Sequence, residues 1–351
     1  MPVSRPTDLA IWARRPASLL LLAVAAAGAC DRGSGSRGPD RVRLGYFPNI
    51  THAPAIVAIE QGFLAEELGR DVAVETRSFN AGPEAVEALF AEALDLSYIG
   101  PSPAINAFVQ SHGEAIRIVS GATSGGAALV VQPAITTPGQ LRGTTLATPQ
   151  RGNTQDVALR AWLRTQGLTA SLEGGGDVSI LPQANAQTLE SFRAGQIQGA
   201  WVPEPWATRL VLEAGGSVLV DERILWPGGR FVTTVVVVRT RLLREHPELV
   251  AAVLRAHVRA VDFLNAEPAR GRDIVNAAIA KVVGRALPAA VLERAWGTLT
   301  FTLDPLAATL RRSAEDAVAV GLLREVTLDG IYDLTLLNTM LARAGRPRVP
   351  A

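Results

Sequence analysis

The stretch "LGYFPNITHAPAIVAIE", residues 44–60, begins as a buried strand would and ends as a helix would. Three polar residues, Asn49, Thr51 and His52, stand between the two parts, with no nucleophile, metal-ligand cluster or phosphate-binding loop beside them. In open α/β sheets, ligands bind at the turns that follow the carboxyl ends of strands. The stretch therefore predicts a strand-turn-helix unit whose turn holds a ligand without reacting with it.

The sequence that follows repeats this alternation. The β-like runs "RVRLGYF", "VAVETRSF" and "LDLSYI" are each followed by a helical run with apolar residues on one face. Strands that alternate with amphipathic helices are typical of βαβ units. We therefore expect an α/β fold with mostly parallel sheets.

An internal similarity indicates two related halves. Residues 84–103, "EAVEALFAEALDLSYIGPSP", align without a gap with residues 187–206, "QTLESFRAGQIQGAWVPEPW". Both segments read as an amphipathic helix, a short turn, a strand of small and aromatic residues and a proline-rich loop. Few residues are identical, so chance similarity stays open as an alternative to two similar lobes.

The limits of the two lobes follow from length and from two apolar runs. A chain of 351 residues exceeds what one core usually accommodates. The runs 127–132 and 231–238 suit fully buried strands, and we expect them to cross between the lobes. The predicted fold is a two-lobed clamshell with these two strands as its hinge. Lobe one then covers 41–132 and, with a helical C-terminus, 234–351, and lobe two covers 133–233.

The N-terminus has the features of an export signal. Two arginines, an apolar run over 19–27 and small residues before Cys30 are typical of a signal peptide, which we place at 1–29. "AAAGAC" resembles the lipobox of bacterial lipoproteins, in which the cysteine is lipidated, although Ala27 stands where leucine is favoured. Residues 30–40 read as a flexible tether. We expect an exported, lipid-anchored protein on the outer face of the cytoplasmic membrane; an ordinary signal peptide cleaved nearby is the alternative.

Composition and motifs argue against several classes of function. The formal net charge is +1, and the chain has no basic stripe with interleaved aromatic residues, so nucleic acid is not an expected partner. The four histidines form no HExxH pair, and Cys30 is the only cysteine, so we expect no metal site. No G-x-G-x-x-G follows the first strand, and we expect no cofactor.

One segment comes close to a hydrolase motif. "GPSPA", residues 100–104, resembles a nucleophile elbow between a strand and a helix. In that motif the residue after the serine donates its backbone N–H to the oxyanion hole, and here that residue is Pro103, which has no N–H. We therefore expect no catalytic residue in this turn.

Polar turns after the predicted strands supply the candidate ligand residues. Their small and amide side chains, together with helix amino termini, suit an anion. Each residue also has a structural reading, as a helix cap, a turn residue or, for tryptophan, part of the core. The candidates from this reasoning are Asn49, Thr51, His52, Asn80, Ser102, Arg151, Asn153, Glu204 and Trp206.

Four segments carry a resemblance to a known family. They are "LGYFPNITHAPAIVAIEQGF", "EALFAEALDLSYIGPSPAI", "ATPQRGNTQDVALRAWL" and "GQIQGAWVPEPWATRLV". With them the chain resembles the substrate-binding proteins of ABC importers in the nitrate/taurine/aliphatic-sulfonate family. The resemblance implies a periplasmic-binding-protein-like clamshell, monomeric and not an enzyme, that passes a small solute to a membrane permease and its ATPase.

The resemblance also implies where the ligand lies. Arg151 occupies a turn position where similar sequences are expected to have an apolar residue, so the local ligand chemistry is open to change. The positions implied as ligand contacts, beyond those above, are Gly82, Gly100, Thr123, Ser124, Gly152 and Thr154.

The identity of the ligand stays open at this point. An aliphatic sulfonate is favoured, and Glu204 makes a taurine-like molecule with an amine equally suitable. Nitrate, bicarbonate, a phosphonate and a pyrimidine-like ligand are alternatives. Two other functions also remain: an enzyme on the same fold, resembling those of thiamine-pyrimidine or menaquinone biosynthesis, and a binding module that senses its ligand through a partner.

Overall fold

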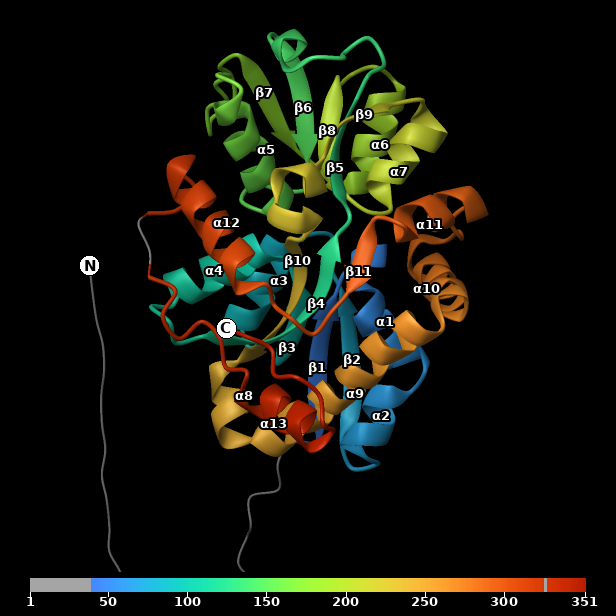
Figure 1. The fold of residues 1–351 in the computed structure, drawn as a ribbon, viewed down its shortest axis with the longest axis vertical. Coiled ribbons are helices and arrows are strands. Elements are labelled where there is room, and N and C mark those ends of the chain that lie inside the picture. The colour runs from blue at the N-terminus through green and yellow to red at the C-terminus, as the bar shows by residue number, and fades with distance from the viewer. Residues whose placement is uncertain (1–38, 325–326) are drawn as a thin grey trace, which may run out of the picture. The chain divides into compact units, whose positions relative to one another are not determined.

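The structure, a computed structural model, describes residues 39–324 and 327–351 and has two separate β-sheets with helices packed on them (Figure 1). The predicted two-lobed α/β fold is confirmed. The predicted signal peptide (1–29), Cys30 and the tether up to residue 38 lie outside the described residues. Within the described part, none of the helices combines the length and the apolar character that crossing a membrane requires.

The opening stretch folds as predicted. Strand β1 (Arg41–Tyr46) is followed by the 3-10 turn η1 (Ile50–His52) and helix α1 (Ala53–Glu60). The turn is closed by backbone hydrogen bonds, from Asn49 N–H to Phe47 O at 2.8 Å and from His52 N–H to Asn49 O at 3.0 Å. These bonds place the three polar residues of the turn at the carboxyl end of β1.

The first sheet has the strand order β11-β4-β10-β3-β1-β2 and is mixed. Its other strands are β2 (Ala73–Ser78), β3 (Leu96–Ile99), β4 (Ile116–Gly125), β10 (Val232–Arg239) and β11 (Leu299–Phe301). β1 runs parallel to β2 and β3, whereas β10 runs antiparallel to β3 and β4. The expectation of a mostly parallel sheet holds for strand direction, since β1, β2, β3 and β4 run the same way. The sheet is mixed because β10, which returns from the other lobe, and β11 run in the opposite direction.

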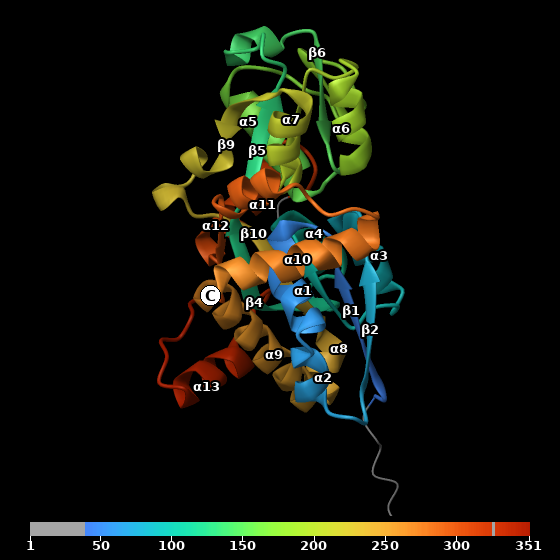
Figure 2. The ribbon, with the colours of Figure 1, turned by 90° about the vertical axis from the view of Figure 1, so that its right-hand side faces the viewer.

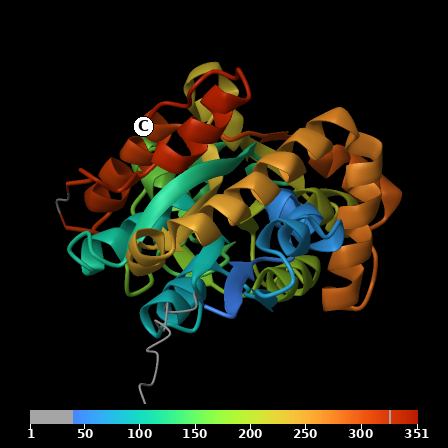
Figure 3. The ribbon, with the colours of Figure 1, turned by 90° about the horizontal axis from the view of Figure 1, so that it is seen from below.

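Helices cover both faces of this sheet, and the valines of β10 show how. Val236 and Val238 belong to one core with α1, whereas Val235 and Val237 belong to another, because successive side chains of a strand point to opposite faces. In Figures 2 and 3, α1, α2, α9 and α10 are grouped on one side of the sheet. Besides α1, the helices described in this lobe are α2 (Phe63–Leu68), α3 (Gly82–Phe90), α4 (Pro101–Gln110), α8 (Thr240–Glu245), α9 (Pro247–Ala266), α10 (Pro268–Val283), α11 (Ala289–Trp296), α12 (Ala307–Ala319) and α13 (Thr335–Arg343).

The second sheet has the order β7-β6-β8-β5-β9 and is also mixed, since β5 runs antiparallel to both its neighbours. Leu129 and Val131 of β5 face a core that includes Trp162 of α5, and Val130 faces the core under α6 and α7. The elements are β5 (Ala127–Val131), η2 (Pro138–Leu141), β6 (Thr144–Thr148), α5 (Thr154–Thr165), β7 (Val178–Pro182), α6 (Asn185–Arg193), β8 (Gly199–Pro203), α7 (Trp206–Ala214), β9 (Ser217–Asp221), η3 (Glu222–Leu225) and η4 (Pro227–Gly229).

The sheets show where the chain passes from one lobe to the other. The sequence placed lobe two at 133–233, but β5 already pairs within the second sheet, and β10 pairs within the first. The passages therefore lie between β4 and β5 and between β9 and β10 (Figure 1). The two apolar runs are buried strands as predicted, but burial alone does not indicate which sheet a strand joins.

Two adjacent glycines make the first passage. Gly125 and Gly126 have φ values of +81° and +75°, which other residues adopt rarely. A Cβ on Gly126 would lie 2.1 Å from Leu299 Cδ2. The second passage runs beside them, since Gly125 N–H donates to Phe231 O at 3.1 Å and Thr233 Oγ1 donates to Gly125 O. The two connections between the lobes are thus bound to each other at this point.

The internal similarity found in the sequence corresponds to a repeated structural unit. Each aligned segment covers most of a helix and a whole strand and ends at the start of a second helix, within α3-β3-α4 in lobe one and α6-β8-α7 in lobe two. The aromatic residues of the two strands, Tyr98 and Trp201, are fully buried. Each finds a polar partner, His257 Nδ1 at 2.9 Å from the Tyr98 hydroxyl and Glu222 Oε2 at 2.7 Å from Trp201 Nε1.

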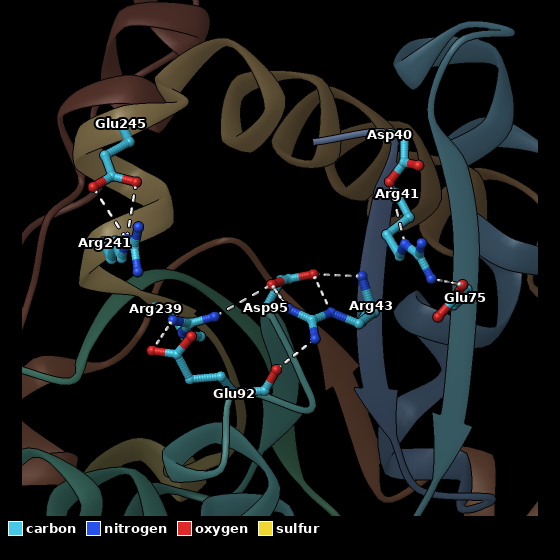
Figure 4. Close-up of polar contacts among 9 residues, drawn as sticks. All are labelled: Asp40, Arg41, Arg43, Glu75, Glu92, Asp95, Arg239, Arg241 and Glu245. Carbon is cyan, nitrogen blue, oxygen red and sulfur yellow. Dashed lines mark hydrogen bonds and ion pairs between the residues drawn. The ribbon is translucent and has the colours of Figure 1, made fainter. Parts of the chain in front are cut away.

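An ionic cluster stabilises the first sheet at the end where β1 and β3 begin (Figure 4). Asp95, 6% exposed, accepts the backbone N–H of Arg43 at 2.9 Å and its guanidinium at 2.6 and 2.9 Å. Arg239, the last residue of β10, lies 3.6 Å from Asp95 and 2.7 Å from Glu92. The cluster joins three neighbouring strands, β10, β3 and β1, at the end of the sheet opposite to the turn that follows β1.

Candidate ligand-binding site

A small cavity of about 30 Å³ lies where the two lobes meet. Lobe one contributes the turns after β1, β2 and β3, and lobe two contributes the turns after β6, β7 and β8. The cavity is lined by Phe47, Asn49, Thr51, His52, Asn80, Ala81, Gly82, Gly100, Pro103, Pro149, Asn153, Thr154, Gln155, Asn185, Pro203 and Thr233. None of these residues carries an acidic or a permanently cationic side chain.

Helix amino termini from both lobes converge on this cavity. Helix α3 begins at Gly82, α4 is capped by Gly100, α5 is capped by Asn153 and α6 begins at Asn185. Each terminus presents backbone N–H groups and the positive end of a helix dipole. The cavity therefore has a positive potential from peptide groups without a charged side chain in its wall.

Two polar atoms of the cavity wall are buried without a partner. These are Thr154 Oγ1 and Asn185 Oδ1. A buried polar group that makes no hydrogen bond costs about 1–3 kcal/mol, so such groups are rare in folded proteins. Both belong to lobe two and line the same small cavity, which is what a site for a polar ligand requires.

His52 faces the cavity as a neutral hydrogen-bond donor. Its Nδ1 accepts the N–H of Phe47 at 3.3 Å, so the ring proton lies on Nε2. Burial lowers the pKa of His52 to about 3, because the charged imidazolium is poorly solvated there. The ring is therefore uncharged at any physiological pH.

Replacing His52 tests this role. His52→Phe is expected to weaken anion binding at least about tenfold, because a hydrogen bond to a charged group is lost. His52→Gln retains an N–H donor and is expected to bind within threefold of wild type, roughly 0.6 kcal/mol. Since the ring stays neutral, the ratio of wild-type to His52→Phe affinity, measured by calorimetry, is constant from pH 5 to 8. A ratio that changes around pH 6.5 would contradict the neutral ring.

Hydrogen bonds from neighbouring strands fix the main chain of the β1 turn. The carbonyl of Thr51 accepts Thr123 Oγ1 at 2.7 Å and Thr234 Oγ1 at 3.1 Å. Both threonines are buried and belong to β4 and β10, the strands that lead to and from lobe two. Thr123 therefore positions a residue of the cavity wall and does not line the cavity itself.

Glu204 and Trp206 follow β8 on the lobe-two side. The Glu204 carboxylate accepts the N–H and the hydroxyl of Thr208 at 3.1 and 2.9 Å. Burial raises the pKa of Glu204 to about 7, although the Thr208 bonds act in the opposite direction. Trp206 Nε1 donates to Asn49 Oδ1 at 2.9 Å, which joins the two lobes across the site.

The structure brings about half of the sequence-predicted residues into the cavity wall. These are Asn49, Thr51, His52, Asn80, Gly82, Gly100, Asn153 and Thr154. The predicted residues that do not line it are Ser102, Thr123, Ser124, Arg151, Gly152, Glu204 and Trp206.

The local structure explains why several of these predicted residues do not line the cavity. Arg151 is exposed, and Gly152 uses its N–H for the Asp156 carboxylate at 2.9 Å, which closes the turn before α5. Ser124 lines a different hollow, beside the passage between β4 and β5. Ser102 is buried in the first turn of α4, and its hydroxyl has no partner.

Sequence reasoning missed several wall residues. Gln155 directly follows Thr154 and is found only once the start of α5 is known. Asn185 follows β7 as Asn49 follows β1, so "VSILPQANAQ" carried the same strand-turn-helix signal. Thr233 sits in an apolar run that reads only as core. The others are Phe47, Ala81, Pro103, Pro149 and Pro203.

Comparison with known proteins gives the family. Residues 35–280 match the profile of the NMT1-like family. The chain belongs to the NMT1-like family. The taurine-binding periplasmic protein of Escherichia coli K12 is 29% identical to it over 216 residues, which cover 61% of this chain and 64% of that protein.

Solved structures of other proteins share the fold of this chain. The alkanesulfonate-binding protein SsuA from Xanthomonas axonopodis pv. citri, bound to MOPS, superposes with a TM-score of 0.67 at 22% identity, over 83% of this chain and 96% of that chain. The periplasmic nitrate-binding protein NrtA from Synechocystis PCC 6803 superposes with a TM-score of 0.74 at 17% identity. The superposition covers 89% of this chain and 91% of that chain. At these identities the likeness establishes the periplasmic-binding-protein fold. The relatives named here are binding proteins of taurine, alkanesulfonate and nitrate.

Proposed function

We propose that this protein is the extracytoplasmic solute-binding component of an ABC importer and that it captures a small anionic organic solute between its two lobes. The observation that carries the proposal is the cavity between the lobes, where four helix amino termini and two unpartnered polar atoms meet. A fully enclosed anion is bound well by peptide N–H groups and neutral donors. Sulfonates, including taurine-like ones, are favoured because named relatives bind them, and nitrate, bicarbonate or a phosphonate are the alternatives.

The proposed cycle uses the two lobes as a hinged clamp. One half of the clamp is the lobe built on the first sheet, and the other is the lobe built on the second sheet. The chain passes between the halves at Gly125–Gly126 and at the β9-β10 connection. A ligand that touches both lobes stabilises their closed arrangement, and a permease with its ATPase then recognises that arrangement. We propose a monomer, since one chain supplies both walls of the cavity.

We further propose that the protein is exported and held at the membrane by a lipid on Cys30. The lipobox-like sequence and the periplasmic location of the named relatives support this. Cys30→Ser is expected to release the protein from the membrane fraction of cells, and mass spectrometry of the wild-type N-terminus is expected to find a diacylglyceryl group. A wild-type protein that is already free in the periplasm would contradict the anchor.

A calorimetric panel tests the proposed function. The panel contains sulfonates, nitrate, bicarbonate and phosphonates at constant ionic strength, each paired with an uncharged analogue. We expect binding of one anion class at micromolar concentration or tighter, weakened by Asn153→Ala. Stimulation of a reconstituted permease-ATPase complex by the loaded protein tests delivery. No anion bound at millimolar concentration would contradict the proposal.

The alternative of an enzyme on this fold is tested by the fate of the ligand. We propose that nothing is transformed, in keeping with the binding proteins named above. Ligand recovered after prolonged incubation with stoichiometric protein is expected to be chemically unchanged by mass spectrometry. Product formation that follows the protein concentration would favour the enzyme.

The pH dependence of binding provides a separate test of the anionic ligand. Glu204 follows Pro203 of the cavity wall and has a pKa of about 7, so it gains its charge as the pH rises from 6 to 8. A negative charge beside the site lowers anion affinity, by about threefold over this range. Glu204→Gln abolishes the change. Glu222→Gln is the matched control, because burial also raises the pKa of Glu222 to about 7 but its carboxylate bonds Trp201 instead.

A further inference from the structure

A second and larger cavity adjoins the first. This outer chamber has a volume of about 400 Å³ and is lined by residues of both lobes. Three asparagines, Asn49, Asn80 and Asn185, line both cavities, so the two cavities lie side by side. The outer chamber is therefore the space next to a ligand head that occupies the inner cavity.

The wall of the outer chamber is mainly apolar. Lobe one contributes Phe79, Val283 and Leu287, and lobe two contributes Leu189 and Trp206. The indole of Trp206 is held on two sides, by its hydrogen bond to Asn49 and by the Arg209 guanidinium 4.6 Å from the centre of its ring. A fixed aromatic side chain on one wall favours a flat apolar group beside it.

The charged residues of the outer chamber are paired with one another. Arg209 donates to Glu213 at 2.9 and 3.0 Å, and Arg285 lies 3.9 Å from the same carboxylate. Glu190 accepts Arg193 at 2.7 Å. An ammonium group on the ligand would therefore meet carboxylates whose charge arginines already compensate, whereas an apolar group gains contact with the apolar wall.

We propose that the outer chamber binds an apolar, preferably aromatic, arm of the same solute whose anionic head occupies the inner cavity. The ligand is then an organic anion with an extended apolar arm, and neither an inorganic anion nor an ω-amino sulfonate. The inference rests on the proposed function and narrows it. It follows from the three asparagines that the two adjacent cavities share, the apolar wall and the internal pairing of the charges.

Two ligand series with matched heads test the inference by calorimetry. The sulfonate series is methanesulfonate, ethanesulfonate, taurine, hexanesulfonate and naphthalene-2-sulfonate, and the carboxylate series is acetate, hexanoate and 2-naphthoate. Affinity is expected to rise by roughly fourfold for each methylene buried, and to be highest for the naphthyl compound. Taurine is expected to bind more weakly than ethanesulfonate, because its ammonium loses water and meets only carboxylates that are already paired with arginines.

Two neighbouring valines provide a matched pair of variants. Val282 and Val283 of α10 are 45% and 44% exposed, but only Val283 lines the outer chamber. Val283→Asn is expected to reduce the affinity for naphthalene-2-sulfonate about threefold and Trp206→Ala at least tenfold, as less apolar area is buried. Val283→Asn binds methanesulfonate within threefold of wild type, and Val282→Asn changes the affinity for neither ligand. Trp206→Ala also weakens methanesulfonate, but less than naphthalene-2-sulfonate, because the Trp206–Asn49 bond between the lobes is lost.

The outcomes separate this inference from the proposed function. Equal affinities for methanesulfonate, nitrate and naphthalene-2-sulfonate, or a preference for taurine over ethanesulfonate, would overturn the apolar arm and leave an anion-binding protein. No binding in either series, with none in the wider panel, would overturn the proposed function and this inference with it.

Discussion

Gly100→Ala lowers the affinity for the tightest-binding anion of the panel at least about thirtyfold, roughly 2 kcal/mol. Gly100 caps α4 in lobe one with a φ of −71°, which any residue adopts, so the backbone itself accepts the change. The new Cβ, however, would lie 2.4 Å from Thr154 Oγ1 of lobe two. The substitution therefore opposes the approach of the lobes and not the folding of either one. Calorimetric titration measures the loss, and the unfolding temperature without ligand is expected to be unchanged.

A double-mutant cycle identifies the cause of that loss. Thr154→Ala removes the atom that the new methyl group meets, so in this background Gly100→Ala is expected to cost less than about threefold. Gly139→Ala is the control, because a Cβ there has no heavy atom within 4 Å. An equal effect of Gly100→Ala in both backgrounds would show that the two residues do not meet in the liganded protein.

Asp95→Asn lowers the free energy of unfolding by about 2 kcal/mol, because the backbone N–H and the guanidinium of Arg43 lose a charged acceptor of their hydrogen bonds. Asp95 is buried and joins Arg43 of β1 to Arg239 of β10, so three strands lose a common anchor (Figure 4). Chemical denaturation monitored by circular dichroism measures the change. Ligand affinity well below the unfolding temperature is expected to be unaffected, because the cluster lies at the opposite edge of the sheet from the cavity.

An exposed ion pair between β1 and the neighbouring β2 serves as the control. Arg41 and Glu75 lie 3.1 Å apart with side chains that are both 52% exposed. Surface pairs of this kind contribute little, so Glu75→Gln is expected to change the unfolding free energy by less than about 0.5 kcal/mol. Similar effects of Asp95→Asn and Glu75→Gln would contradict the anchoring role of the buried cluster.

The fold was largely predictable from the sequence because periodicity reports burial. Runs such as "FVTTVVVV" are apolar at all but two positions, and a strand covered on both faces needs a composition of this kind. Strand direction and sheet membership were not predictable in the same way. Both depend on where the chain goes after each strand, and β5 and β10 have similar composition although they belong to different sheets.

The site was predictable only where a polar residue follows a recognisable strand. Asn49 and Asn153 were found because strand and helix signals flank them, and Asn185 could have been found by the same argument. Thr233 could not, since it reaches the cavity only because β10 returns beside Gly125. Arg151 is exposed and does not line the cavity, and a charged residue in a turn has the same sequence signature whether it faces a ligand or solvent.

The order of strands in the first sheet has a consequence for how the chain folds. Strand β10 lies between β3 and β4 in this sheet, yet it is synthesised only after all of lobe two. Every strand pairing of the second sheet falls within residues 127–221, so that lobe can fold as a contiguous unit. Until β10 arrives, β3 and β4 each have an unpaired edge, and such edges favour aggregation. Lobe two is thus expected to reach its native state first, and completion of lobe one, with its high contact order, to limit the folding rate.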